Sequence, residues 1–206
     1  MLEALERGPL SLAGLTTATR LPRATAHRLA AALEVHGLVR RDADGRFALG
    51  LRLVRLGREA AADLPVTEVA RPALEALRDE TGESTQLYVR DGDRRVCLVS
   101  LESPHGLRTI VPVGASLPLD AGSAGRVLQG GAPASARRGW VESVGEREAG
   151  VASVSAPVHD DGGAVLAAVS VSGPIERTSR SPGRRYGAAV LEAAAAVEAA
   201  LGGTSA

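Results

Sequence analysis

The strongest constraint on the fold is the order of patterns in residues 11–50, where two short helical segments precede two extended runs. Ser11 is a predicted N-cap for the first helix, Ser11–Ala18, and Gly37 ends the second. The extended runs 38–41 and 46–49 flank Asp44-Gly45, a hairpin signal. The second helix has apolar residues at i, i+3, i+4 and i+7, which predict its buried face: Ala26, Leu29, Ala30 and Leu33. Helix, turn, helix and two-stranded wing predict a winged helix-turn-helix domain over residues 1–50.

A change of periodicity divides the chain near Pro65. Helical spacing continues over Leu51–Ala62, breaks at Pro65 and resumes over Thr67–Thr81. We therefore expect a linker helix in residues 51–65 and a second domain in residues 66–206. Extended runs and turn residues follow, and an Ala-rich helix over Arg184–Leu201 closes the chain, which predicts an α+β domain with an antiparallel sheet. The runs read as strands are 84–90, 95–102, 108–113, 150–158 and 164–172.

The charge distribution separates the same two parts. The chain has 24 cationic and 24 acidic residues, yet residues 1–60 contain ten Arg against six acids and carry a net charge of +4. A basic segment joined to an acidic remainder is typical of a chain in which one part meets a polyanion. The single Cys97 excludes an internal disulfide, and no apolar run reaches the ~20 residues of a membrane span. We expect a cytoplasmic protein without a membrane partner.

The second predicted helix presents a basic face made of small and cationic residues. With its apolar stripe buried, Arg23, Thr25, His27 and Arg28 point outward. Small residues allow close approach to a major groove, where Arg reaches guanine edges or phosphates. Arg41 and Arg46, with Arg40, lie on the predicted wing beside flanking DNA. The alternative is that these are ordinary solvated arginines on a small helical domain.

Several sequence blocks resemble the IclR family of bacterial transcription regulators in the same order along the chain. The blocks are LAGLTTATRLPRATAHRLAAALEVHGLVRRDADGRFALG from Leu12, TGESTQLYVR from Thr81, VPVGASLPLDAGSAGRVL from Val111, RRGWVESVGEREAGVASVSAPV from Arg137 and AAVSVSGPIER from Ala167. The resemblance implies a winged helix-turn-helix joined by a linker helix to a GAF-like antiparallel-sheet domain that binds an effector. GEREAGVASVSAPV and SVSGPIER are similar to the actinobacterial NdgR-like branch, which is associated with leucine and branched-chain amino acid biosynthesis.

The resemblance also implies effector-binding residues in the second domain. The family's small-residue loop before a helix matches the run 122–125, including Ser123 and Ala124, whose backbone N–H groups suit a carboxylate. The effector-contacting strand position after the Glu146–Gly150 motif matches Ser153. A family position that is often acidic falls on Ser143, so its role is not carried over. The Ser-x-Ser-Gly-Pro motif is intact and contributes Ser170 and Ser172.

Strand geometry supports the same serines independently of the family. Side chains alternate with period two, so Ser153 and Ser155 share one face of their strand, as do Ser170 and Ser172. Hydroxyl groups supply donors and acceptors without bulk, which fits a small polar metabolite such as an amino acid or 2-oxo acid. The alternative is that these serines form the wet side of a half-buried sheet.

Motifs of catalysis are missing from the sequence. It contains no Gly-x-Ser-x-Gly, P-loop or dinucleotide-binding pattern, and four scattered His with one Cys do not form a metal-ligand spacing. We therefore expect no enzyme activity, catalytic residue, metal or cofactor. The expected function is a DNA-binding regulator, a homodimer or dimer of dimers, that senses a small metabolite. A stand-alone small-molecule-binding module without functional DNA binding is the alternative.

Two segments depart from the family pattern. The segment before the helix-turn-helix, Met1–Glu6, is shorter than its family counterpart, which predicts a reduced first helix. The connection Gln129–Ala136 is also short, and the family places a longer helical stretch there. Either this connection is shortened or the sequence omits residues there. In the first case, we expect the wall of the effector pocket that this segment forms in the family to be missing.

Overall fold

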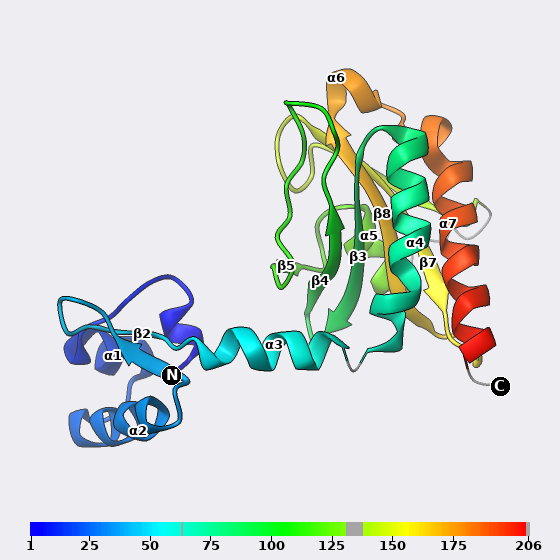
Figure 1. The fold of residues 1–206 in the computed structure, drawn as a ribbon. Coiled ribbons are helices and arrows are strands. Elements are labelled where there is room, and N and C mark those ends of the chain that lie inside the picture. Colours follow the sequence, from blue (N-terminus) through cyan, green and yellow to red (C-terminus); the bar gives the residue numbers. More distant parts are fainter. Residues whose placement is uncertain (63, 131–137, 205–206) are drawn as a thin grey trace. The chain divides into compact units, whose positions relative to one another are not determined.

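A computed structural model describes residues 1–62, 64–130 and 138–204 of the chain. The chain forms two compact units, Met1–Asp63 and Leu64–Ala206. Each unit has a hydrophobic core of its own, so each is described by itself (Figure 1). None of the helices in these described ranges is both long and apolar enough to cross a membrane.

The first unit has the predicted order of helix, turn, helix and wing. The side chain of Ser11 accepts a hydrogen bond from the Gly14 N–H, which confirms the N-cap, and Gly37 adopts a positive φ of 67° after the second helix. Phe47 of the wing is buried in the core of this unit. The elements are η1 (Glu3–Leu5), α1 (Leu12–Thr19), α2 (Arg23–Val35), β1 (Val39–Arg41), β2 (Phe47–Leu49) and α3 (Arg52–Ala62).

One residue of the predicted α2 stripe is not buried. Ala26 and Ala30 are fully buried and Leu33 packs against the core, whereas Leu29 remains 43% exposed. The core contact is centred on the row formed by Ala26 and Ala30. Leu29 precedes Ala30 by one residue, which turns it about 100° around the helix toward the outer face. The prediction of a buried Leu29 was wrong for this reason.

The second unit is an α+β domain, as predicted, built on a six-stranded antiparallel sheet. The spatial order of its strands is β5-β4-β3-β8-β7-β6. The strands are β3 (Ser84–Asp91), β4 (Arg94–Leu101), β5 (Ser116–Pro118), β6 (Val141–Val144), β7 (Val151–His159) and β8 (Val165–Pro174). The helices are α4 (Pro65–Thr81), α5 (Ser123–Leu128), α6 (Ile175–Thr178) and α7 (Pro182–Thr204).

The two faces of this sheet are covered differently. Helices α4 and α7 lie side by side over one face, where aliphatic side chains of the central strands pack against them (Figure 1). Short helix α5 and the segment before it cover part of the other face, with Tyr88, Cys97 and Ala168. Alternation along the strands separates these two sets, since neighbouring side chains point to opposite faces.

Some predicted boundaries differ from the observed ones. Residues 108–113 do not form a strand, because Pro112 has no N–H and the Thr109 carbonyl accepts from the Ser84 hydroxyl instead of a neighbouring strand. The edge strands β5 and β6 were missed because they have only three and four residues. Pro65 does not interrupt a helix but occupies the first turn of α4, where its missing N–H is tolerated.

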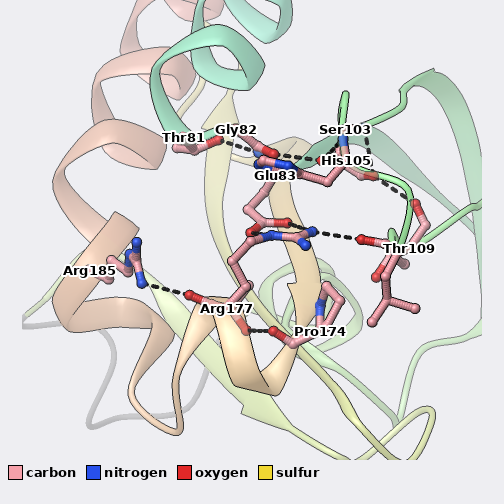
Figure 2. A network of polar contacts seen from close by, with 12 residues as sticks. Thr81, Gly82, Glu83, Ser103, His105, Thr109, Pro174, Arg177 and Arg185 are labelled. Carbon is pink, nitrogen blue, oxygen red and sulfur yellow. Dashed lines mark hydrogen bonds and ion pairs between the residues drawn. The ribbon is translucent and has the colours of Figure 1, made fainter.

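A buried ion pair joins Glu83, the residue before β3, to Arg177 of α6, the short helix that follows β8 (Figure 2). The Glu83 carboxylate is fully buried and accepts from Nε and Nη2 of Arg177, at 2.5 and 2.8 Å. Arg177 also donates to the Leu107 carbonyl, which ties in the segment after β4. A Cβ at Gly173 would lie 2.2 Å from Oε2 of Glu83. Glycine at the fourth position of the Ser-x-Ser-Gly-Pro motif therefore makes room for this carboxylate.

Candidate nucleic-acid interface and ligand cavity

Helix α2 carries a basic surface whose charges are unpaired. Arg23, His27 and Arg28 are exposed, and Thr25 is half-buried near the start of the helix. Within the described ranges, none of these four side chains has a hydrogen bond or ion pair. Free guanidinium groups beside small residues are able to reach an anionic partner without first breaking an internal contact.

The wing arginines differ from those of α2 because acidic or carbonyl groups already hold them. Arg46 pairs with Asp42 at 3.0 Å and with Asp44 at 2.9 Å. Arg41 donates to the Gly45 carbonyl and lies 4.1 Å from the centre of the Phe47 ring. Sequence reasoning treated these two arginines as equivalent to those on α2. Their positive charge is partly offset, so the wing offers a weaker field to a polyanion.

Predicted serines of the second unit lie on one face of the sheet, in two rows across the strands. In the first row, Ser153 of β7 pairs with Ser143 of β6 and with Ser172 of β8. In the second row, Ser170 of β8 pairs with Ser155 of β7 and with Gln86 of β3. Because directly opposed residues share a face, the register brings these hydroxyl groups together.

Ser123, at the start of α5, covers the serine face of the sheet. Its hydroxyl lies 2.7 Å from the hydroxyls of both Ser153 and Ser155, and Ser155 in turn donates to Ser170 at 2.9 Å. Ala124 is buried beside them. The cavity that remains has about 20 Å³, which is room for about one water molecule. A metabolite enters only if the serine hydroxyls exchange their mutual hydrogen bonds for bonds to the ligand.

The loop before α5 is held by the Glu146–Gly150 motif. Gly122 has a positive φ of 85°, and its N–H donates to Oε2 of Glu146 at 3.2 Å. The other Glu146 oxygen pairs with Arg126 at 2.9 Å. This arrangement corrects one expectation, because the Gly122 N–H already has a carboxylate acceptor within the chain and is not free for a ligand.

Sequence reasoning missed part of the cavity wall. Gln86, Tyr88, Arg95, Ser143 and Arg147 all line the cavity. Period-two alternation over the run Ser84–Tyr88 places Gln86 on the serine face, so Gln86 could have been predicted from the sequence. Arg95 and Arg147 could not have been predicted in this way, because an Arg on an expected strand or turn ordinarily points to solvent.

Burial shifts the pKa of three ionisable groups near the cavity. Burial lowers the pKa of Arg95 and raises that of Tyr88 above its usual range. Burial also raises the pKa of the Cys97 thiol to about 12, so the thiol stays protonated at neutral pH. In the described part of the chain, no group of three or more His, Cys, Asp or Glu is arranged to hold a metal ion.

Family models match both units of the chain. The IclR helix-turn-helix domain matches residues 2–43, and the bacterial transcriptional regulator IclR C-terminal domain matches residues 58–136 and 132–199. The chain belongs to the IclR family. It is a transcriptional regulator with a helix-turn-helix domain and an effector-binding domain. The two C-terminal matches meet within the short connection, whose residues 131–137 lie outside the described ranges.

Individual relatives of this IclR-family chain are distant but cover most of it. The HTH-type transcriptional regulator KipR of Bacillus subtilis (strain 168) is 27% identical over 82% of this chain and 80% of its own length. The transcriptional repressor IclR of Escherichia coli (strain K12) is 25% identical over 97% and 86%. A solved IclR homolog from Microbacterium hydrocarbonoxydans, complexed with 4-hydroxybenzoate, is 26% identical over 97% and 95%, with a TM-score of 0.78.

We predict different consequences for arginines on α2 and on the wing. Arg28→Ala is expected to cost about 1–3 kcal/mol of specific DNA affinity and to blur sequence choice, because an exposed Arg on the recognition helix reads base edges. Arg46→Ala is expected to weaken binding to all sequences alike, since it leaves Asp42 and Asp44 unneutralised near the phosphates. Binding isotherms on specific and scrambled duplexes measure both effects.

The control is Arg90→Ala, which removes an exposed arginine of the second unit that donates to the Gly92 carbonyl. It is expected to leave both isotherms unchanged. An unchanged specific affinity for Arg28→Ala would remove α2 from the role of recognition helix.

Proposed function

We propose that this chain is a sequence-specific, dimeric DNA-binding regulator whose second unit senses a small metabolite. Residues 1–50 bind DNA, residues 51–65 link the domains and residues 66–206 bind the effector in the serine-lined cavity. The observation that carries this proposal is the unpaired basic face of α2 in the same chain as a hydroxyl-lined cavity. We place the protein in the cytoplasm and assign it no catalytic activity, metal or cofactor.

The DNA-binding proposal rests on charge and exposure. Arg23, Thr25, His27 and Arg28 line one helix face without internal partners among the described residues, and the exposed Leu29 adds an apolar contact of the kind that reads a thymine methyl. The net charge of +4 on residues 1–60 supplies attraction to phosphates. Arg41 and Arg46 then act from the wing on the flanking backbone.

The dimer proposal rests on α3, which leaves apolar side chains uncovered. Val54 is 55% exposed and Leu56 is 42% exposed, with Leu53 half-buried beside them. A helix with such a stripe gains stability by packing against a second copy. Two copies related by a two-fold axis place two α2 helices on successive major-groove faces, which requires a near-palindromic site.

Footprinting on the upstream region of the chain's own gene tests the DNA-binding proposal. We expect protection of two half-sites about one helical turn, ~34 Å, apart or a multiple of it. Protection of a single half-site would contradict the dimer. Ligand binding without DNA binding at low salt would favour a stand-alone small-molecule-binding module instead.

The effector proposal rests on the two serine rows. Hydroxyls of Ser123, Ser153, Ser170 and Ser172, with Ala124 beside them, line a cavity whose donors and acceptors match a small polar molecule with a carboxylate, such as an amino acid or a 2-oxo acid. The cavity must widen from about 20 Å³ to admit such a ligand. A structural relative that is complexed with 4-hydroxybenzoate carries a carboxylate ligand. We propose branched-chain amino acid metabolism as the source of the effector, in keeping with the blocks 145–158 and 170–177.

Removing two of these hydroxyls tests the cavity directly. Ser170→Ala with Ser172→Ala is expected to weaken binding of leucine, valine or their 2-oxo acids several-fold to tens of fold, because each lost neutral hydrogen bond costs about 0.5–1.5 kcal/mol. Calorimetry measures the affinity, and circular dichroism checks that the domain stays folded. Ser116→Ala, on edge strand β5 and outside the cavity, is the matched control. Equal affinity in the double variant would place the effector site elsewhere.

A further inference from the structure

The cavity wall carries two guanidinium groups and no carboxylate. Its polar lining consists of the serine rows, Gln86, Tyr88, Arg95 and Arg147. Within the described residues that line the cavity, none is Asp or Glu. Glu146, whose carboxylate holds the loop before α5, is occupied by the Gly122 N–H and by Arg126. The residues that line the wall therefore contribute positive charge and no carboxylate of their own.

Arg95 is a buried cation without a carboxylate partner in the part of the chain that the structure describes. It is 2% exposed, and its Nη1 donates to the carbonyl oxygens of Pro118 and Ala121, the latter at 2.8 Å. Its guanidinium carbon lies 5.4 Å from the centre of the Tyr88 ring, and its Nε has no partner among the described residues. Asp120 acts on Arg95 only through its Coulomb field. Carbonyls and a ring orient the guanidinium, but no carboxylate of the described residues forms an ion pair with it.

Two further donors face the same cavity. Gln86 is fully buried; its Oε1 accepts from the Ser172 hydroxyl at 3.0 Å, whereas its Nε2 has no partner within the described ranges. Arg147 is half-buried, and its one ion pair among the described residues is with the exposed Glu148 at 3.5 Å. Its Coulomb field acts on Arg95 and opposes that charge. Buried donors without acceptors are costly, so a ligand that supplies acceptors and negative charge relieves several groups at once.

We propose that the cavity selects a ligand of net negative charge, a small carboxylate without an ammonium group, and that Gln86, Arg95 and Arg147 make this selection. The inference rests on the proposed function, because it takes the serine-lined cavity as the effector site. A zwitterionic amino acid brings an ammonium group that finds no carboxylate on the wall and is repelled by two guanidinium groups. The matching 2-oxo acid replaces that ammonium with a carbonyl oxygen, which accepts hydrogen bonds from Gln86 or a serine.

Calorimetry on the full chain with paired probes of one carbon skeleton tests this selection. The probes are leucine and 4-methyl-2-oxopentanoate, valine and 3-methyl-2-oxobutanoate, with succinate and glutarate as further anions. We expect at least one 2-oxo acid or dicarboxylate to bind about tenfold or more tightly than either amino acid, because charge-assisted hydrogen bonds are stronger than neutral ones. Arg147→Gln is expected to weaken the binding of that anion about tenfold. It is also expected to reduce the difference in affinity between that anion and the amino acids.

Controls separate charge selection from loss of folding. Arg147 is partly exposed, so its replacement is compatible with folding; Arg95→Gln and Gln86→Leu are used only where thermal unfolding shows an intact domain. Arg90→Gln removes an exposed arginine outside the cavity and is expected to leave all affinities unchanged. The proposal is overturned if an amino acid binds as tightly as its 2-oxo acid, if Arg147→Gln leaves the anion affinity unchanged, or if none of the anions binds.

The same samples report separately on the proposed function. If the chain binds DNA and also binds an amino acid in a way that depends on Ser170 and Ser172, the proposed function holds. That result would reject only the charge selection. If the unmodified chain does not bind DNA, the proposed function itself is rejected.

Discussion

Alternation along the three central strands β3, β7 and β8 is the constraint on which the second unit depends. One set of side chains is aliphatic and packs against α4 and α7, and the other set is rich in hydroxyl and amide groups. A shift of one residue in register would exchange the two sets, burying the serines under the helices and exposing the core. The pairs Ser153 with Ser172 and Ser155 with Ser170 therefore fix the core and the cavity together.

Polar groups around the cavity use only part of their hydrogen-bonding capacity on one another. The serine hydroxyls form a linear chain of hydrogen bonds from Ser123 through Ser155 to Ser170, while donors of Gln86 and Arg95 have no partner among the described residues. A cavity of about 20 Å³ with unused donors is a site that is chemically prepared but sterically closed. Ligand entry then requires Ser123, the first residue of α5, and the loop before it to separate from the sheet. Movement of that loop is a physical route by which occupancy changes the conformation of the unit.

Local patterns predicted the elements that depend on local forces. The Ser11 cap, the Gly37 stop and the Asp44-Gly45 hairpin follow from backbone preferences of single residues and appear as expected. Predictions were wrong where tertiary contacts decide: Leu29 lies beside the contact row instead of in it, and the run 108–113 finds a side-chain partner instead of a strand.

The candidate site also divides into residues that local patterns indicate and residues whose positions depend on tertiary contacts. Family blocks and period-two spacing indicated the serines, whose meeting needs only strand pairing in register. Arg95 was invisible to such reasoning, because its burial depends on carbonyls of the run 118–121, more than twenty residues away. The pairing of Arg46 with Asp42 and Asp44 was equally hidden, although all three lie in one turn, because charge counts do not show which side chains meet.

A thermodynamic cycle between ligand and DNA tests the central claim most directly. If the cavity controls the DNA-binding unit, saturating ligand changes DNA affinity by some factor, and saturating DNA must change ligand affinity by the same factor, typically about 5–150-fold. We predict equal factors, both different from one, when the two affinities are measured by titration under one salt condition. Identical ligand affinity for free and DNA-bound chain would show that the cavity and the DNA-binding face are uncoupled, and would contradict the account.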